Sequence, residues 1–539
     1  MGIPFYFKSL ISRFPDIVNL PNGTCDALYL DFNCIIHMCA QKLAASENSP
    51  HDFGTFHNHV ITNSLNYIDH ILKHVLPAAL LYIAVDGACP RSKMQQQRKR
   101  RFMSMWRTRK QTELGLKRNE CSVWDSNIVT PGTEFMKEFD QRLRDHVVAM
   151  QKHHAFKIQV SGSDEFGEGE HKIFDHMNQC EDHKSVVVYG LDADLILLSI
   201  LQEKFLISLM REVPEFNVVN FERHSPFLML SIPFLKSAIT REYMFGNAGR
   251  TNDYVMLCTL IGNDFIPPLS FLKIKSDGID ILLRLYHKHV SNNKDDFLVS
   301  TESKCPTLNW KLLTDIVKDL ADIEDTSMLE VSNTYYSGKV FIDQRFPEGR
   351  IDNYPMLFKF PKVIDISQHN WRTRYNKMLF QYNNTNVVNT ACELYIEGIN
   401  WVFQYYFTKN HNLGWYYPFH YSPTCLDLYN YLIASDSNHI SLVLEKSKNK
   451  HNTHKEFINY IQHHGFQLLM VLPPSSKLLL PTELQQIMEN VEYGCVQYYP
   501  QNFDITTYLK SYLWECSAII PDINIDLLHQ AYKKVNQKI

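Results

Sequence analysis

The sequence lacks several features that would each place the chain in a particular class of protein. Its longest apolar stretch, residues 75–85, is well short of the ~20 residues that a membrane-spanning helix needs. The 12 cysteines form no C-x-x-C pair and no Cys/His cluster at zinc spacing. No signal peptide is recognised, so we expect reduced thiols in an intracellular protein and no association with a membrane. A cytoplasmic location is favoured, and the nucleus stays open as the alternative.

An excess of positive charge is also missing. The formal net charge of the 539 residues is −4, so any contact with nucleic acid must come from a local basic surface. Hydrophobic residues make up 45% of the chain and charged residues 21%, as in ordinary globular proteins. No internal repeat is visible, and the length predicts more than one domain.

Short buried strands that lead into acidic residues are the main pattern in the first half of the chain. Apolar, β-branched runs of four to six residues are typical of strands that are buried on both faces. They are residues 27–30 followed by Asp31, residues 80–85 followed by Asp86, and residues 186–189 followed by Asp192 and Asp194. Helical patterns separate them, which predicts an α/β fold with a mainly parallel central sheet and helices on both faces. In such folds ligands bind at the carboxyl ends of the strands.

Two pairs of acids share an i, i+2 spacing. Asp192 and Asp194 follow a predicted strand, and Glu168 and Glu170 alternate with Gly167 and Gly169. In extended backbone such pairs point the same way, and glycine lets the chain pass close to a site. Four carboxylates aimed at one point repel each other unless a cation neutralises them, and Mg²⁺ or Mn²⁺ suits an all-oxygen ligand set. The alternative is a set of solvated surface acids.

A strongly basic segment follows Asp86. Residues 91–110 include nine Lys or Arg and are expected to form a helix. Lys93, Gln97, Arg100 and Arg101 fall at i, i+4, i+7 and i+8, so they share one face of that helix. A cationic face beside carboxylates suits an enzyme that cleaves phosphodiesters, because cations hold a phosphate while metal ions activate water. The alternative is a solvated amphipathic helix.

The remaining chain divides into a connection and a second folded region. Residues 308–320 have helical spacing, residues 324–349 are expected to be irregular, and a long helix is predicted near 387–407. The predicted organisation is a first region over 1–290, a variable connection over 291–350 and a helix-rich second region over 351–539, packed onto the first.

These motifs, taken in order, resemble the XRN family of 5′→3′ exoribonucleases. The matching pieces are MGIP (1–4), YLDFNCIIH (29–37), VDGACPRSKMQQQRKRRF (85–102), NIVTPGTEFM (127–136), GEGEHKI (167–173), VVVYGLDADLI (186–196), LIGNDFIPPL (260–269), YIEGINWVFQYYF (395–407), WYYPFHYSP (415–423) and MVLPPSSKLLLP (470–481). They fall in two blocks that resemble the two conserved regions of the family's catalytic core. The chain therefore resembles a minimal, viral member with a PIN-like nuclease core, and extra C-terminal modules are not expected.

The resemblance implies roles for residues at matching positions. The acids that match the family's metal ligands are Asp31, Asp86, Glu168, Glu170, Asp192, Asp194 and Asp264. Lys93, Gln97, Arg100 and Arg101 match the pocket for the 5′-terminal phosphate. His37 and an aromatic residue of the second region match the groups that stack on the leading base. Where the family has two tryptophans before Tyr-Tyr-Pro, Leu413 takes the first place and Trp415 the second, so the assignment of Trp415 stays open.

The implied activity is processive hydrolysis of single-stranded, 5′-monophosphorylated RNA to nucleoside 5′-monophosphates with two Mg²⁺ or Mn²⁺ ions. A monomer is expected, and the sequence does not identify protein partners. Two other functions compete with this one. A DNA nuclease related to flap endonucleases shares parallel strands that end in acidic residues but has no counterpart of residues 395–481. A catalytically disabled RNA-binding scaffold is disfavoured because all seven acids are present.

Overall fold

The structure is a computed structural model. It describes residues 6–21, 23–47, 49–116, 124–180, 182–213, 225–291, 296–301, 305–342, 349–380, 385–408, 410–434, 439–449, 457–461 and 463–536. The MGIP motif at 1–4 lies outside the described residues. The chain forms two compact units, which we describe separately. Unit 1 comprises Met1–Cys89, Cys121–Val255 and Ile461–Leu468, and unit 2 comprises Pro90–Glu120, Met256–Tyr460 and Leu469–Ile539.

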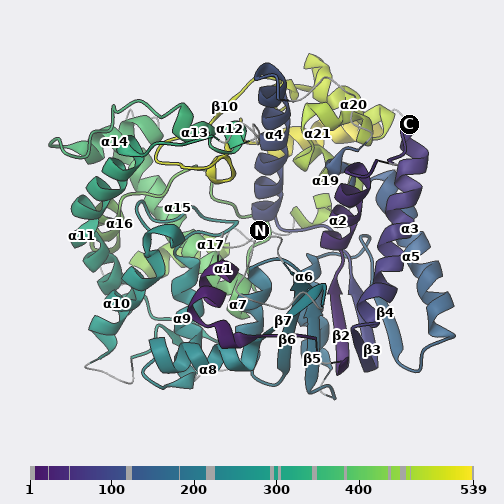
Figure 1. Ribbon diagram of the computed structural model, residues 1–539. Helices are drawn as coiled ribbons and strands as arrows, with labels where there is room; N and C mark the ends of the chain where they lie inside the picture. Colours follow the sequence, from purple (N-terminus) through teal and green to yellow (C-terminus); the bar gives the residue numbers. More distant parts are fainter. Residues whose placement is uncertain are drawn as a thin grey trace. The chain divides into compact units, whose positions relative to one another are not determined.

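A seven-stranded sheet forms the centre of unit 1, in the order β1-β7-β6-β5-β2-β3-β4 (Figure 1). Its strands are β1 (Val18–Asn19), β2 (Gly23–Asp31), β3 (Val75–Ala84), β4 (Lys157–Ser161), β5 (Ser185–Tyr189), β6 (Leu206–Glu212) and β7 (Phe227–Ser231). The five strands from β4 to β6 are parallel, whereas β7 and β1 pair antiparallel at one edge. The mainly parallel sheet predicted from the sequence is confirmed.

Helices connect the parallel strands of unit 1. They are α1 (Tyr6–Arg13), α2 (Asn33–Ala44), α3 (Phe53–Leu72), α5 (Glu134–Gln151), α6 (Gly169–Gln179), α7 (Asp194–Ile200) and α8 (Ile232–Tyr243), with α9 (Thr251–Thr259) running into unit 2. Crossovers between parallel strands are right-handed, which places α3 and α5 on one face and α6 and α7 on the other. The contacts agree, since α3 packs against α5, and α7 packs against α6 and α8.

Unit 2 is mainly helical. Its helices are α4 (Arg91–Glu113), α10 (Gly278–Val290), α11 (Trp310–Ser337), α12 (Gly349–Asp352), α13 (Tyr354–Leu357), α14 (Trp371–Leu379), α15 (Thr385–Phe403), α16 (Cys425–Ile433), α17 (His439–Asn449), α20 (Thr482–Glu489) and α21 (Ile525–Asn536), and α19 (His464–Val471) continues from unit 1. Two small antiparallel pairs accompany them, β8 (Val299–Ser300) with β9 (Thr307–Leu308) and β10 (Asp504–Ile505) with β11 (Ala518–Ile519). None of the described helices combines the length and the apolar character that crossing a bilayer requires.

The basic helix α4 lies in the core of unit 2. Its apolar side chains Phe102 and Trp106 are buried in two clusters, one with Ala518 and Ile520 and the other with Ile351 and Leu513. A helix that only displayed charge to solvent would not contribute residues to a core. The helix also buries the charged side chains of Lys93, Arg98 and Arg101, so its basic residues do not all belong to a solvated face.

The long helix α11 differs from the sequence-based expectation. The sequence pattern predicts an irregular segment over 324–349, but α11 continues through this region to Ser337. Its later turns bury Glu324, Met328 and Tyr335. The buried acid interrupts the helical spacing of apolar residues. A prediction based on apolar residues alone therefore does not detect this part of the helix.

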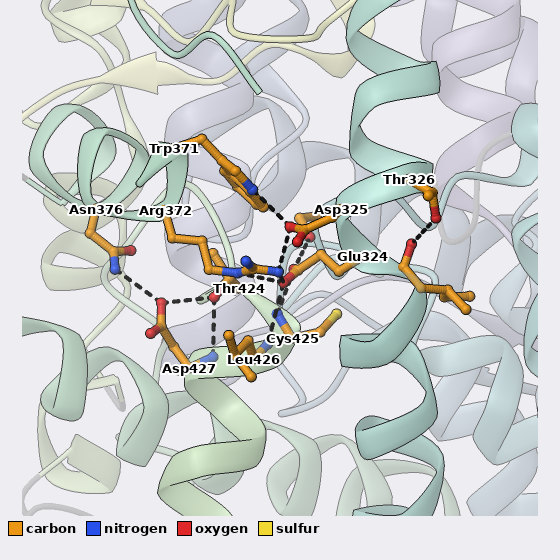
Figure 2. Close-up of polar contacts among 12 residues, drawn as sticks. Glu324, Asp325, Thr326, Trp371, Arg372, Asn376, Thr424, Cys425, Leu426 and Asp427 are labelled. Carbon is orange, nitrogen blue, oxygen red and sulfur yellow. Dashed lines mark hydrogen bonds and ion pairs between the residues drawn. The ribbon is translucent and has the colours of Figure 1, made fainter. Parts of the chain in front are cut away.

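Glu324 is fully buried and accepts hydrogen bonds from three different segments of unit 2 (Figure 2). One carboxylate oxygen accepts from Cys425 N at 2.6 Å and Ser270 Oγ at 2.9 Å. The other accepts from Arg372 Nε and Nη2, at 3.1 and 2.9 Å, and from Leu426 N at 3.3 Å. The acid therefore caps the N-terminus of α16, where exposed N–H groups favour an anion.

We predict that Glu324→Gln destabilises unit 2. The substitution removes the negative charge opposite Arg372. It also places an amide N–H donor against the backbone N–H groups of Cys425 and Leu426. Breaking a buried ion pair costs about 3–5 kcal/mol. Urea unfolding followed by far-UV circular dichroism measures the loss. The matched control is Asp322→Asn on the same helix, which removes an exposed pair with Lys318 and should leave the midpoint nearly unchanged. Equal midpoints for the two variants would contradict this role of Glu324.

Candidate active site

Six acids of unit 1 lie at the carboxyl edge of neighbouring parallel strands. Asp31 is the last residue of β2, Asp86 follows β3 by two residues, and Asp192 and Asp194 follow β5. Strand β2 pairs with both β3 and β5, so these ends meet at one edge of the sheet. Glu168 and Glu170 begin α6, which packs against β2 and β3. Asp31, Glu168, Glu170 and Asp194 are each less than 9% exposed.

The N-terminus of α6 approaches two of these carboxylates closely. Gly169 N donates to Asp86 Oδ1 at 2.7 Å. A Cβ atom at Gly169 would lie 2.8 Å from Asp31 Oδ1 and 3.3 Å from Asp86 Oδ1. A Cβ atom at Gly190 would lie 3.3 Å from Asp31 Cβ, so the Asp31 side chain is bordered by two glycines. The absence of a side chain at Gly169 lets its backbone approach both carboxylates, whereas at Gly190 the position of a Cβ is taken by Leu195 Cδ1.

A firmly anchored loop positions Glu168 and Glu170. Backbone hydrogen bonds join Gly87 N to Gly167 O at 2.9 Å and Gly167 N to Ala88 O at 2.8 Å. Gly167 has φ +113°, which a residue with a side chain adopts only with strain. Lys172 of α6 donates to the carbonyls of Val85 and Gly162 at 2.8 and 2.7 Å. This buried ammonium therefore ties α6 to the segments on either side of the acidic edge.

Two further groups hold the same region. Asp86 N donates to Asn33 Oδ1 at 3.0 Å, which connects the end of β3 to the start of α2. Asp140 of α5 accepts from Ser163 N and Oγ, and burial raises the pKa of its carboxyl. Burial also lowers the pKa of Lys172, although nearby carboxylates, Asp86 first, oppose that shift. Sequence patterns do not identify Asn33, Asp140 or Lys172, because a single polar residue carries no periodic signal.

The donor set at this edge fits a hard divalent cation. All six side chains offer carboxylate oxygens, which Mg²⁺ and Mn²⁺ prefer. Gly169 leaves open the space beside Asp31 and Asp86 that a Cβ would fill. In the part of the chain that the structure describes, no three His, Cys, Asp or Glu side chains converge as a preformed metal site.

The seventh acid, Asp264, belongs to unit 2 and sits in a tight turn. Asn263 Oδ1 accepts from the backbone N–H groups of Phe265 and Ile266 at 2.9 and 3.0 Å. Gly262 has φ +100°, and a Cβ there would meet Pro268 Cδ at 2.7 Å. The Gly-Asn-Asp motif is thus explained locally. Gly262 makes the turn, Asn263 closes it, and Asp264 is presented from it.

Lys93 is the partner of Asp264 in the structure. Its Nζ lies 3.0 Å from Asp264 Oδ2, and both side chains are nearly buried. Burial raises the pKa of Asp264, but the Lys93 ammonium more than offsets this and holds the pKa below its usual range. The acid therefore stays ionised at neutral pH.

The basic residues of α4 divide into two sets. Arg98 is 1% exposed and donates to the carbonyl oxygens of Pro521, at 2.9 Å, and Tyr498. Arg91 donates to Ile523 O, and Arg107 pairs with Asp352, so these cations hold unit 2 together. The other set contains the predicted stripe, in which Lys93 and Arg101 are buried, Gln97 is half-buried and Arg100 is exposed.

The two candidate stacking residues differ in their surroundings. His37 lies on α2 in unit 1 and is half-buried. Trp415 in unit 2 is 6% exposed, stacks on Trp401 with ring centroids 5.5 Å apart, and donates from Nε1 to Glu397 at 3.2 Å. Gly398 lies beneath its ring, because a Cβ there would approach Trp415 to 3.0 Å. Stacking on Trp401, the close approach of Gly398 and the Nε1 hydrogen bond thus engage most of the Trp415 side chain in packing, which argues against base stacking by this residue.

Two family models match the chain. The model described as "XRN 5'-3' exonuclease N-terminus" matches residues 1–213, and the model described as "Xrn1 helical domain" matches residues 248–334 and 362–539. The matched segments cover most of both folded units.

Curated relatives extend over the whole chain. Human 5'-3' exoribonuclease 1 is 26% identical over 100% of this chain and 34% of its own length, and the Schizosaccharomyces pombe protein of that name is 25% identical over 97% and 48%. Arabidopsis thaliana 5'-3' exoribonuclease 2 is 24% identical over 100% of this chain and 68% of its own length. The chain thus spans about a third to a half of the exoribonuclease 1 relatives. A solved structure, the catalytic core of Rad2 with a DNA substrate, aligns with a TM-score of 0.28 and 13% identity over 62% of this chain and 86% of its own.

The space at Gly169 leads to a prediction. Gly169→Ala should weaken Mn²⁺ binding by about 10–100-fold, because the new methyl group would push against the Asp31 and Asp86 oxygens. Isothermal titration of the protein with Mn²⁺ measures the change. Gly54→Ala near the start of α3 is the matched control, since its Cβ would meet only Asp52 Oδ1, at 3.7 Å. If both variants bound Mn²⁺ as the unmodified chain does, the ion would not lie beside Asp31 and Asp86.

Proposed function

Because the chain belongs to the XRN family of 5′-3′ exonucleases, we propose that it is a processive 5′→3′ exoribonuclease. Its substrate is single-stranded RNA with a 5′ monophosphate, and its products are nucleoside 5′-monophosphates. The observation that carries the proposal is the six carboxylates at one edge of the parallel sheet, in a chain whose two units both match the family. The relatives' names, which specify 5′-3′ exoribonucleases, support RNA as the substrate class.

The carboxylates would hold the metal ions. Asp31, Asp86, Glu168, Glu170, Asp192 and Asp194, together with Asp264, offer the oxygen ligands for two Mg²⁺ or Mn²⁺ ions. When bound, the ions supply Lewis-acid activation of water and neutralise the charge that develops on the leaving 3′ oxygen. The α6 N-terminus, through Gly169 N, orients the Asp86 carboxylate. Lys172 holds the loop that carries Glu168 and Glu170.

The basic stripe would bind the 5′ phosphate. Lys93, Arg100 and Arg101 offer charge-assisted hydrogen bonds, and Gln97 adds an amide donor. Since Lys93 also contacts Asp264, its ammonium would link binding of the 5′ phosphate to one of the proposed metal-binding acids. Each cleavage creates a new 5′ monophosphate, so the same pocket can draw in the next nucleotide. A pocket sized for one phosphate would reject capped or triphosphorylated ends by steric exclusion.

His37 is the residue that we propose for stacking on the leading base, at about 1–3 kcal/mol per stacked base. The packing of Trp415 does not support the same role, and we assign this tryptophan to the core of unit 2. The intracellular, mainly cytoplasmic location and the monomeric state stay predictions from the sequence.

The catalytic proposal predicts the behaviour of a double variant. Asp192→Asn with Asp194→Asn should lower the rate of Mg²⁺-dependent RNA hydrolysis at least about 100-fold, because two ligand oxygens are lost while the shape is kept. The measurement is release of nucleotides from a 3′-labelled RNA with a 5′ monophosphate, with EDTA as the metal-free reference. Asp182→Asn, in the turn before β5, serves as the control. Undiminished hydrolysis by the double variant would exclude these acids from the reaction.

The pocket proposal predicts a change in end preference. The unmodified chain should degrade 5′-monophosphorylated RNA at least about tenfold faster than 5′-hydroxyl RNA, since the loss of one charge-assisted interaction has this magnitude. Arg100→Gln should reduce that ratio without changing the rate on the hydroxyl substrate. Because Arg100 is exposed, the variant is expected to fold, which thermal unfolding checks. An unmodified chain that degrades both substrates equally would disprove the pocket.

A further inference from the structure

Unit 2 contains a small polar cavity whose lining residues have no role in the proposed reaction. Its volume is about 30 Å³, which corresponds to space for roughly two water-sized groups. The polar side chains that line it include Ser270, Lys273, His420, Ser422, Tyr508 and Lys510. They come from separate segments of the chain, so the cavity is formed by the tertiary structure and not by one loop.

Three of these side chains carry buried polar atoms without a hydrogen-bond partner in the part of the chain that the structure describes. They are Ser422 Oγ, Tyr508 OH and His420 Nδ1. Ser422 is 1% exposed and Tyr508 is 3% exposed. A buried polar group without a partner costs about 1–3 kcal/mol, so three such groups around one cavity indicate a ligand with acceptor atoms.

The charge at the cavity is positive. Lys273 and Lys510 are both lining residues, and among the described residues the carboxylate that pairs with Lys273 is Glu515, 3.9 Å from its Nζ. Burial lowers the pKa of Lys273 to about 8, so it remains mostly protonated at neutral pH. Burial lowers the pKa of His420 to about 3, so its ring is neutral and can donate from one nitrogen. Two cations with hydroxyl and imidazole donors suit a phosphate group.

Strained backbone holds the lining residues in place. Leu509 has φ +52°, a left-handed conformation that a leucine adopts only at a cost. Its carbonyl accepts a hydrogen bond from Lys273 Nζ. This turn places Tyr508 and Lys510, the residues on either side of Leu509, at the same cavity.

The segments that line the cavity continue into an aromatic platform. Tyr512 and Trp514 stack with centroids 5.9 Å apart and an angle of 13° between their planes. Lys275 Nζ lies 3.8 Å from the centroid of Tyr512. Trp514 is 47% exposed, which leaves ring surface accessible to solvent. A basic residue beside an exposed aromatic ring is an arrangement on which the bases of single-stranded nucleic acids stack.

We propose that this cavity and the platform form a second RNA-contacting site, in which a backbone phosphate occupies the cavity and a neighbouring base stacks on Trp514. The two non-bridging oxygens of a phosphodiester match the two water-sized positions, Ser422, Tyr508 and His420 donate to them, and Lys510 supplies the charge. The site would bind a nucleotide other than the 5′-terminal one. The inference rests on the proposed function for the identity of the substrate.

The test is direct binding of RNA in EDTA, measured by fluorescence anisotropy with 3′-labelled, 5′-monophosphorylated RNAs from two to about sixteen nucleotides long. Lys510→Gln and Trp514→Ala should each weaken binding of the longest RNA by about tenfold and leave dinucleotide binding unchanged. Tyr508→Phe removes only the hydroxyl and should have a smaller effect in the same direction. Lys311→Gln and Phe341→Ala replace exposed residues of the same types elsewhere in unit 2 and should bind as the unmodified chain does.

Two results would overturn the site. The first is unchanged affinity of Lys510→Gln and Trp514→Ala for the longest RNA. This result would overturn the site even if Lys510→Gln changed how well added inorganic phosphate displaces the RNA. The second is an equal loss for the dinucleotide, which would indicate an effect on the leading-nucleotide pocket. Because binding is measured without metal, these results are independent of hydrolysis. A chain that binds RNA in the expected length-dependent way but does not hydrolyse it would disprove the proposed function alone.

Discussion

Electrostatic repulsion among carboxylates is the constraint on which the first unit depends. Six acids lie at one edge of the sheet, and four of them are almost fully buried. Like charges gathered at one edge oppose folding, and the surrounding groups offset part of this cost. Gly169 N and Asn33 hold Asp86 from two sides, while Lys172 ties together the loops that carry the acids. The remaining cost favours binding of a divalent cation.

In the second unit, the same problem of buried charge has a different solution. Glu324 is neutralised by Arg372 and by the N-terminus of α16, and Asp264 by Lys93. Arg98 donates from both terminal guanidinium nitrogens to backbone carbonyls. Each pair joins segments that are distant in the sequence, so the charges that could destabilise the helical unit also define how its helices pack. The helix α4 serves both purposes, because one of its faces is core and another carries the proposed phosphate-binding stripe.

The position of the acids along the chain is predictable from local patterns, but the way in which they are held is not. A buried parallel strand has a clear local signature, and whatever follows it lies at the carboxyl edge of the sheet. Asp31, Asp86 and Asp192 can therefore be assigned to that edge from the amino-acid pattern alone. In contrast, the turn around Asp264 depends on Asn263 and Gly262, and its ion pair with Lys93 joins residues 171 positions apart. The burial of Trp415 similarly depends on Glu397, which accepts its Nε1 hydrogen bond, and on Gly398, which lies against its ring.

The sequence by itself determined the parallel sheet, the acidic edge and the basic stripe, because these follow from periodicity and spacing within short segments. Only the tertiary structure decided which charges are structural, that α11 continues through Glu324, and that Ser422, Tyr508, His420 and Lys510 line one cavity. The physical reason is that a charge or hydroxyl has no preferred role until its surroundings are set. Burial, hydrogen-bond partners and neighbouring charges come from segments hundreds of residues away, and no local pattern records them.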